Sequence, residues 1–200
     1  MPSVVDLTRA TLSPDACVAR LFNAAIAAAA CLAVLTPRLA HADDVPPALA
    51  LTVMLKVITY DAAFAARGGG DFVVLVPYGP KEDADAKDAI EAGEALEQKA
   101  IVGRTIRYTA VPLAELAARA ASASAILVHR HTSAAQAKTI AAAAGRLYTL
   151  ALDPALVDDS ILLGVGSASG RPQVAINVRV AREAGVEFAP TVLKIARTVQ

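Results

Sequence analysis

Cysteine and aromatic side chains are scarce in this chain of 200 residues. It holds two cysteines, Cys17 and Cys31, and no tryptophan, and aromatic residues make up only 4% of it. Both cysteines fall in an N-terminal segment that we expect to be removed, so the rest of the chain has no thiol. This absence excludes a disulfide framework, a thiol nucleophile and a thiolate metal site from that part of the chain.

An excess of charge is also missing, because 19 Lys and Arg residues balance 19 Asp and Glu residues. No electrostatic argument therefore favours binding to nucleic acid or to an anionic membrane. What the chain has instead is hydrophobic residues, at 56%, which are enough for one domain with a sizeable core. Many of them are alanine, which favours small helices that pack closely on a sheet.

Residues 1–42 have the pattern of a signal peptide. Basic residues precede an apolar run over residues 21–35, and Ala40 and Ala42 supply the small side chains that a signal peptidase needs. The run is short for a transmembrane helix, although an uncleaved anchor is the alternative. We expect cleavage after Ala42 and an exported domain of residues 43–200.

Segments with strand and helix patterns alternate through this domain, and the last two strands are separated only by a turn of Gly and Ser. Expected strands are 72–76, 105–111, 125–128, 147–152, 161–165 and 173–177; expected helices start at Pro46-Pro47, at Pro80, at Leu113, at Thr132 or Ser133, and twice after residue 177. This order predicts an α/β fold: a single-domain mixed sheet of about six strands flanked by helices, with a C-terminal β-hairpin and two closing helices.

The C-terminal segment carries the most distinctive pattern. Ile176-Asn177 leaves a strand, Ala184-Gly185-Val186 ends a short helix, and a closing amphipathic helix follows with apolar positions up to Val199. This order resembles the C-terminal signature of the YfiR-like family of small periplasmic proteins. Gly103-Arg104 also resembles the Gly-Arg pair that opens the family's second strand. The chain has no Trp-Pro pair, and its part after residue 42 has none of the cysteines usual in the family, so it resembles a divergent member.

The resemblance implies a function that needs no reactive residues. The best-known member of the family restrains a membrane-bound diguanylate cyclase. By resemblance, the chain is a non-catalytic periplasmic regulatory or sensory protein that binds an inner-membrane signalling partner of the diguanylate cyclase or histidine kinase type. A homodimer is a further possibility for its assembly, and neither a cofactor nor nucleic acid is expected. The alternative is a periplasmic small-molecule-binding protein, and an enzyme is the weakest hypothesis because no nucleophile–base motif is present. Gly103, Arg104, Asn177 and Gly185 are expected to be structural.

Two features are candidates for sites. His129 and His131 follow the third strand at a spacing that places both on one side, so they could share a metal if Asp153 or Asp158 supplied a third ligand. The alternative is a polar strand end. The acidic residues between residues 82 and 97 recur at every third position and are interpreted as a solvated helix face.

The first helix of the exported domain is apolar on more than one side. Leu51, Val53, Met54 and Val57 are candidates for binding a partner, because the apolar arc exceeds the stripe that one sheet face would need. Packing of this helix in the core is an alternative of the same weight.

Overall fold

The structure of the chain is a computed structural model that describes residues 45–168 and 170–200. The expected signal peptide, with Ala40, Ala42 and both cysteines, lies outside the described residues. Every element considered below belongs to the unit that begins at residue 43. In this unit no helix of the described residues has both the length and the apolar character to cross a membrane.

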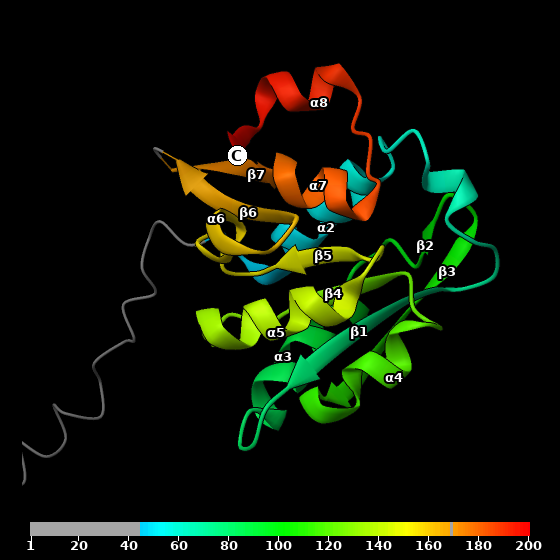
Figure 1. Cartoon of the computed structure of the whole chain (residues 1–200), viewed down its shortest axis with the longest axis vertical. Coiled ribbons are helices and arrows are strands. Elements are labelled where there is room, and N and C mark those ends of the chain that lie inside the picture. Colours follow the sequence, from blue (N-terminus) through cyan, green and yellow to red (C-terminus); the bar gives the residue numbers. More distant parts are fainter. Residues whose placement is uncertain (1–44, 169) are drawn as a thin grey trace, which may run out of the picture. The chain divides into compact units, whose positions relative to one another are not determined.

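Helices and strands alternate along the described chain (Figure 1). In chain order the elements are α2 (Pro47–Ile58), the 3-10 turn η1 (Phe64–Ala66), β1 (Phe72–Tyr78), α3 (Asp83–Glu94), β2 (Ala100–Ile101), β3 (Arg104–Pro112), η2 (Leu113–Glu115), α4 (Leu116–Ala120), β4 (Ala125–Val128), α5 (Ala134–Ala144), β5 (Tyr148–Ala151), α6 (Leu156–Asp159), β6 (Leu163–Ala168), β7 (Arg171–Asn177), α7 (Val178–Ala184), α8 (Pro190–Ile195) and β8 (Arg197–Val199).

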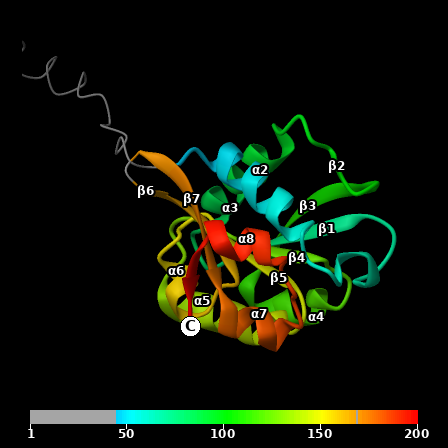
Figure 2. The same cartoon turned by 90° about the horizontal axis from the view of Figure 1, so that it is seen from above.

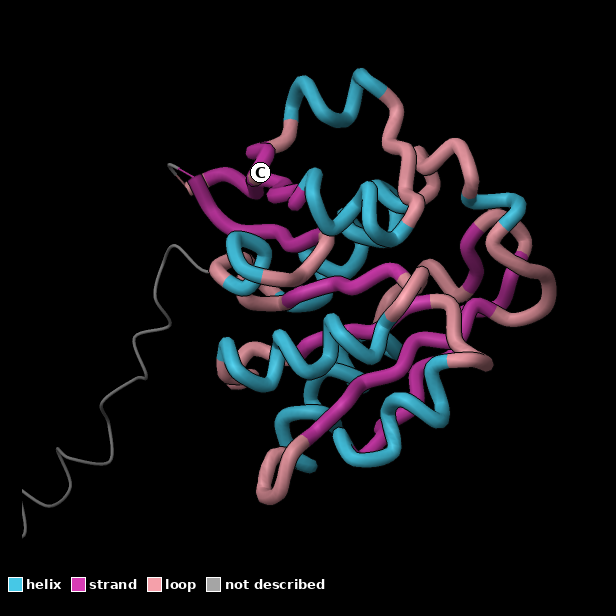
Figure 3. Tube along the Cα trace, viewed as in Figure 1, coloured by secondary structure: helices cyan, strands magenta, loops and turns pink. Residues whose placement is uncertain are grey.

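The strands form one mixed sheet in the order β2-β3-β1-β4-β5-β6-β7-β8. The five strands from β3 to β6 in this order are parallel, β7 returns antiparallel to β6 as a hairpin, and β8 lies parallel to β7. Figure 3 shows the strands side by side with helices packed around them. The predicted α/β fold with a mixed sheet, a C-terminal hairpin and two closing helices is confirmed, although the described sheet has eight strands rather than about six.

The two additional strands are short segments at the two ends of the sheet. β2 pairs with the start of β3, and β8 pairs with the end of β7. The sequence pattern predicted that the closing helix reaches Val199, which is wrong: α8 ends at Ile195, and Ala196 is extended at φ −86° and ψ 150°. Hydrogen bonds to β7 decide the conformation of this last segment, and no local pattern shows that partner.

Both faces of the parallel strands are covered, which explains why these strands are nearly continuous apolar runs. In β1, Val74 and Val76 face a core shared with α2 and α3, whereas Leu75 faces a second core under α4, α5 and α6. The same alternation places Leu127 of β4 in the first core and Ile126 in the second. The view in Figure 2 shows helices on both sides of the sheet.

Asn177 and Gly185 bound α7. The Asn177 side chain is buried, accepts a hydrogen bond from the backbone N–H of Val180 at 3.1 Å and donates one to the carbonyl of Val157 at 2.8 Å. It therefore caps the helix and joins β7 to α6. Gly185 ends the helix in the left-handed conformation at φ 66°, which a side chain would strain.

Candidate functional site at the carboxyl ends of the strands

The carboxyl ends of β1 and β4 form the point where the strand order reverses. From β1 the chain passes through α3 to β3 on one side, and β4 lies on the other side of β1. The helices that follow these two strands lie on opposite faces, because α3 contributes to the first core and α5 to the second. In open α/β sheets, the crevice at such a switch point is where ligands bind.

Glu82 lies in this crevice and ties the loop after β1 to the start of α5. Its carboxylate accepts a hydrogen bond from the backbone N–H of Gly79 at 2.8 Å and two from Nε2 of Gln136 at 2.8 and 3.0 Å. Gln136 is itself held in a capping box with Ser133 at the N-terminus of α5. The hydrogen bond from Gln136 is the main reason why the pKa of Glu82 is lowered below its ordinary value.

His129 is the buried histidine of the site, with 2% of its surface exposed. Its Nε2 lies 3.6 Å from Oε2 of Glu82, and its Nδ1 has no hydrogen-bond partner among the described residues. Burial lowers the pKa of His129, and the nearby Glu82 carboxylate only partly opposes that effect. The imidazole is therefore neutral at neutral pH and has hydrogen-bonding capacity to spare.

His131 is exposed and points to a different carboxylate. Its Nδ1 lies 2.8 Å from Oδ1 of Asp85, on the first turn of α3. Beside this pair is a cavity of about 150 Å³. It is lined by Pro47, Asp85, Asp88, Ala89, His129, Arg130, His131 and Leu152.

The cavity combines opposite charges with an apolar wall. Two acidic residues of α3, Asp85 and Asp88, and the basic Arg130 from the loop after β4 are in its lining. Arg130 also donates a hydrogen bond to the backbone carbonyl of Val45, which fixes the start of the described chain at the rim of the cavity. A hollow of this kind, with few polar groups converging over apolar side chains, is typical of small-ligand sites.

The two histidines do not share a metal site in the structure. His131 is paired with Asp85 and His129 lies beside Glu82, and no group of three His, Cys, Asp or Glu side chains able to hold a metal ion occurs within residues 45–168 and 170–200. The expected third ligands are engaged elsewhere: Asp153 accepts from the N–H of Ala155 at 2.9 Å, and Asp158 pairs with Arg197 at 2.7 Å.

Sequence reasoning missed Glu82 and Asp85, which it assigned to a solvated helix face. Both are only partly exposed, because the loop after β4 lies against the start of α3. A signal was available: both acids lie just after a buried strand, and so do the histidines. Carboxyl ends of neighbouring parallel strands share one edge of the sheet, so these residue types could have been expected to meet there.

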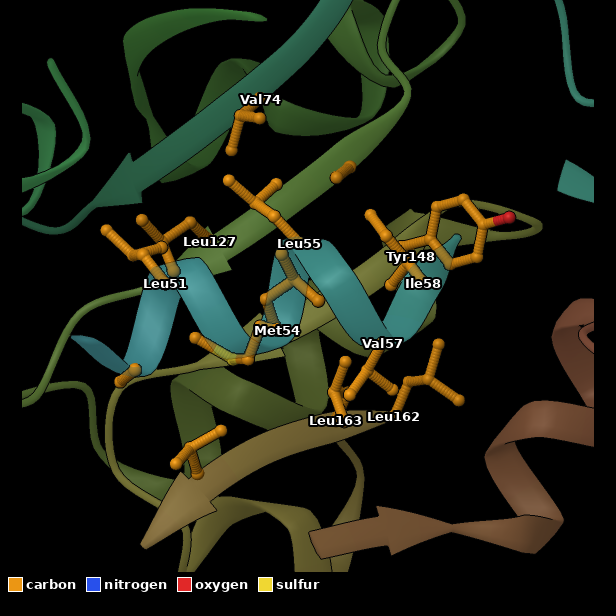
Figure 4. Packing of buried hydrophobic residues seen from close by; sticks show 14 of the residues in the cluster. Leu51, Met54, Leu55, Val57, Ile58, Val74, Leu127, Tyr148, Leu162 and Leu163 are labelled. Atoms are coloured by element: carbon orange, nitrogen blue, oxygen red, sulfur yellow. The ribbon is translucent and has the colours of Figure 1, made fainter. Parts of the chain in front are cut away.

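Three of the partner-binding candidates on α2 are core residues, which corrects that expectation. Leu51 and Met54 are fully buried and Val57 is 8% exposed, whereas Val53 is half-buried. Figure 4 shows why the apolar arc is so wide: Leu55 points toward Val74 of the sheet, and Val57 points toward Leu162 and Leu163 at the start of the hairpin. The helix is therefore covered from two directions by its own chain.

Gly103 and Arg104 hold the amino end of the sheet. Gly103 turns the chain between β2 and β3 at φ 79°. The Arg104 guanidinium donates to the backbone carbonyls of Gly70 and Asp71, and its centre lies 5.1 Å from the centre of the Phe72 ring. Both residues are thus remote from the carboxyl-end crevice.

Among the described residues, three hollows of larger volume lie away from the crevice, and the smallest of them, of about 160 Å³, has Pro154 and Arg197 in its lining. One of about 200 Å³ lies between α5 and α7 and includes Ser160 and Arg179 in its lining. Another of about 290 Å³ lies near the amino ends of β4 and β5, where Arg67 and Arg146 line it. Volume alone favours these hollows, but only the crevice lies at the switch point of the sheet, and for that reason we take it as the candidate site.

Comparison with known proteins gives a fold but no family. No protein-family model matches the chain, and no curated protein matches it. Among solved structures, the ABC domain in complex with L-Trp from Streptococcus pneumoniae is similar at 14% identity and a TM-score of 0.53, over 78% of this chain and 62% of that one.

Two further structures are similar at the same level. A conserved domain protein from Vibrio cholerae shares 14% identity at a TM-score of 0.56, over 78% of this chain and 61% of that one. A substrate-binding protein with adhesive properties from Clostridium difficile, in a ligand-free, open form, shares 12% identity at a TM-score of 0.55, over 79% of this chain and 61% of that one. At these identities the likeness establishes the α/β fold alone. The chain spans about three fifths of the length of each of these structures.

Proposed function

We propose that this protein is a non-catalytic binding protein that takes a small polar ligand in the cavity at the carboxyl ends of β1 and β4. The observation that carries the proposal is the position of that cavity: it lies at the switch point of the sheet, and charged groups converge there over an apolar wall.

The lining favours a small molecule with an ammonium group, such as a free amino acid. Asp85 and Asp88 bring two acidic side chains to the cavity, and these suit an ammonium group. Leu152 and Ala89 offer apolar contact to the rest of such a molecule. Two of the structural neighbours support this direction, since one is called a substrate-binding protein and another contains L-Trp.

Thermal unfolding of the purified protein in the presence of each proteinogenic amino acid tests the proposal. A ligand that binds only the folded state raises the melting temperature. We expect at least one amino acid to do so, and the effect to be lost in Asp85→Asn. The matched control is Asp83→Asn, which makes the same charge change two residues earlier, at a residue that does not line the cavity. Equal stabilisation of both variants, or stabilisation by no amino acid, would contradict the proposal.

A second candidate function is regulation of a membrane-bound signalling partner, as the YfiR-like resemblance implies. The observation that favours it is the arrangement of the C-terminal segment, in which Asn177 caps α7 and Gly185 ends it. A regulator needs a different affinity for the two states of its partner and no reactive groups. Ligand binding at the crevice is compatible with this role, because it could bias that affinity.

The regulatory role is tested by co-purification with the periplasmic region of a diguanylate cyclase or histidine kinase encoded beside this protein. Retention of that region on immobilised wild-type protein supports the role. Failure to retain it, with both proteins folded by circular dichroism, would remove this candidate and leave the ligand-binding proposal intact.

A further inference from the structure

A carboxylate that comes from the chain itself lies beside the first turn of α5. Glu82 reaches it from the loop after β1 and accepts hydrogen bonds from Gln136 Nε2 and from the backbone N–H of Gly79. Gln136 is the third residue of α5, a helix of 11 residues whose N-terminal end favours negative charge.

The hollow that receives this carboxylate has more hydrogen-bonding capacity than Glu82 uses. His129 and Thr132 line it, and they are 2% and 6% exposed. The His129 Nδ1 and the Thr132 hydroxyl have no hydrogen-bond partner among the described residues. Buried polar groups without partners are uncommon, so two in one hollow indicate a site built for a polar guest.

The Glu82 carboxylate fills the hollow but is not locked there. With Glu82 in place, no room is left for a water-sized molecule in the hollow, whose lining is completed by Pro77, Tyr78, Gly79, Leu113, Gln136 and Ile140. Yet 24% of the Glu82 side chain is exposed, so its carboxylate can leave toward solvent. The preceding residue, Lys81, has a left-handed backbone at φ 73°, which is strained for a residue with a side chain.

We propose that this hollow is a carboxylate-binding site and that Glu82 is its exchangeable internal ligand. A small carboxylic acid replaces the Glu82 carboxylate on Gly79 and Gln136, and Glu82 then swings into solvent. The charge of the site is unchanged by the exchange, because one carboxylate replaces another.

This proposal stands apart from ligand binding in the neighbouring cavity. The two hollows share only His129 in their linings, and neither hydrogen-bond donor to the Glu82 carboxylate, Gly79 or Gln136, lines the other cavity. Failure of one proposal therefore leaves the other standing.

The experiment removes the internal ligand and supplies an external one. Glu82→Ala is unfolded thermally at pH 7 in increasing sodium acetate, with sodium chloride replacing acetate to hold the ionic strength constant. We expect the variant to melt below the wild type and acetate to raise its melting temperature with saturation. By calorimetry, acetate should bind the variant about tenfold or more tightly than the wild type, because a tethered competitor acts at a high effective concentration.

Two control variants identify the site. Asp83→Ala, next to Glu82 but outside the hollow, should respond to acetate as the wild type does. In the double variant Glu82→Ala/Gln136→Ala the response should disappear, because the main donor to the carboxylate is gone. If Glu82→Ala does not fold, Glu82→Gln takes its place, since its neutral amide fits the hollow but competes less well with acetate.

The same titration can overturn the proposal. If acetate raises the melting temperature of the folded Glu82 variant no more than chloride does, Glu82 is a structural tie between the loop after β1 and α5. Equal acetate binding in the single and double variants would place the bound acetate elsewhere, and would also overturn the assignment.

Discussion

Replacing Asp61 should destabilise the fold more than any surface change, because its carboxylate joins three parts of the chain. The side chain is fully buried and accepts hydrogen bonds from Nε of Arg67 at 2.7 Å, from the Tyr148 hydroxyl at 2.7 Å, and from the backbone N–H groups of Glu187 and Ala63 at 2.8 and 3.1 Å. Burial alone would raise the pKa of Asp61, but these four donors lower it below its ordinary value of 3.8.

The magnitude follows from what the variant leaves behind. Removing one partner of a buried ion pair costs about 3–5 kcal/mol, because the other charge is left uncompensated. Arg67 keeps hydrogen bonds to the carbonyls of Arg146, Ala184 and Gly185, and these reduce the free-energy cost of leaving its charge without Asp61. We therefore expect Asp61→Asn to lower the free energy of unfolding by about 3 kcal/mol, at the low end of that range. Tyr148→Phe removes one donor to a charged group and should cost about 1.5 kcal/mol.

Urea unfolding followed by circular dichroism measures both losses. The control is Asp71→Asn, whose partner Arg107 is 65% exposed, and a surface pair of this kind contributes about 0–1 kcal/mol. Because the folded pKa of Asp61 is lowered, its contribution is present above pH 3.8 and is lost as the pH falls through the folded value. If Asp61→Asn and Asp71→Asn unfold at the same urea concentration, the reasoning is refuted.

Four further outcomes follow from single side chains. Asn177→Ala should lose about 2 kcal/mol in urea unfolding, because both the cap of α7 and a buried hydrogen bond disappear; unchanged stability would contradict its role. Gly93→Ala should cost about 1–3 kcal/mol, since a Cβ there would lie 2.4 Å from the Tyr108 ring, and Tyr108→Leu in the same chain should relieve the loss. Val57→Glu should abolish the circular dichroism signal of the fold, because it buries an unpaired charge. A folded variant would contradict the burial of this residue in the core. Because the pKa of His129 is lowered in the folded protein, the unfolded chain binds this proton more readily, and the stability of the wild type should fall as the pH drops below about 6.5. In His129→Gln the melting temperature should depend less on pH over the same range.

The parts of the fold that could be predicted are those encoded by local patterns. The buried strand Phe72–Tyr78 is a run of apolar residues, and its covered faces follow from that run. Ser133 is the N-cap of α5, one of the two caps that the sequence indicated, and it forms a capping box with Gln136. The hairpin of β6 and β7 follows from two apolar segments around a short polar turn.

The parts that could not be predicted depend on residues distant in the sequence. The surroundings of α2 are one case, because Val57 is covered by Leu162 and Leu163, more than a hundred positions away. The site is the other case: Glu82 meets Gln136 only after β1 and β4 pair, and a helical period of acids gives no hint of that contact. Periodicity shows which side of a helix is polar, but not what lies opposite that side.

Mapping the residues that the ligand contacts is the most direct test of the central claim, which is that the carboxyl-end crevice is the functional site. Two-dimensional ¹H–¹⁵N NMR spectra of the wild-type protein are recorded during titration with the amino acid that stabilises it most. Binding in the crevice predicts that the largest shift changes fall on residues 85–89 and 129–132, and that Asp85→Asn abolishes them. Changes centred instead on Ser160 and Arg179, or on Arg67 and Arg146, would place the ligand in another hollow and contradict the account.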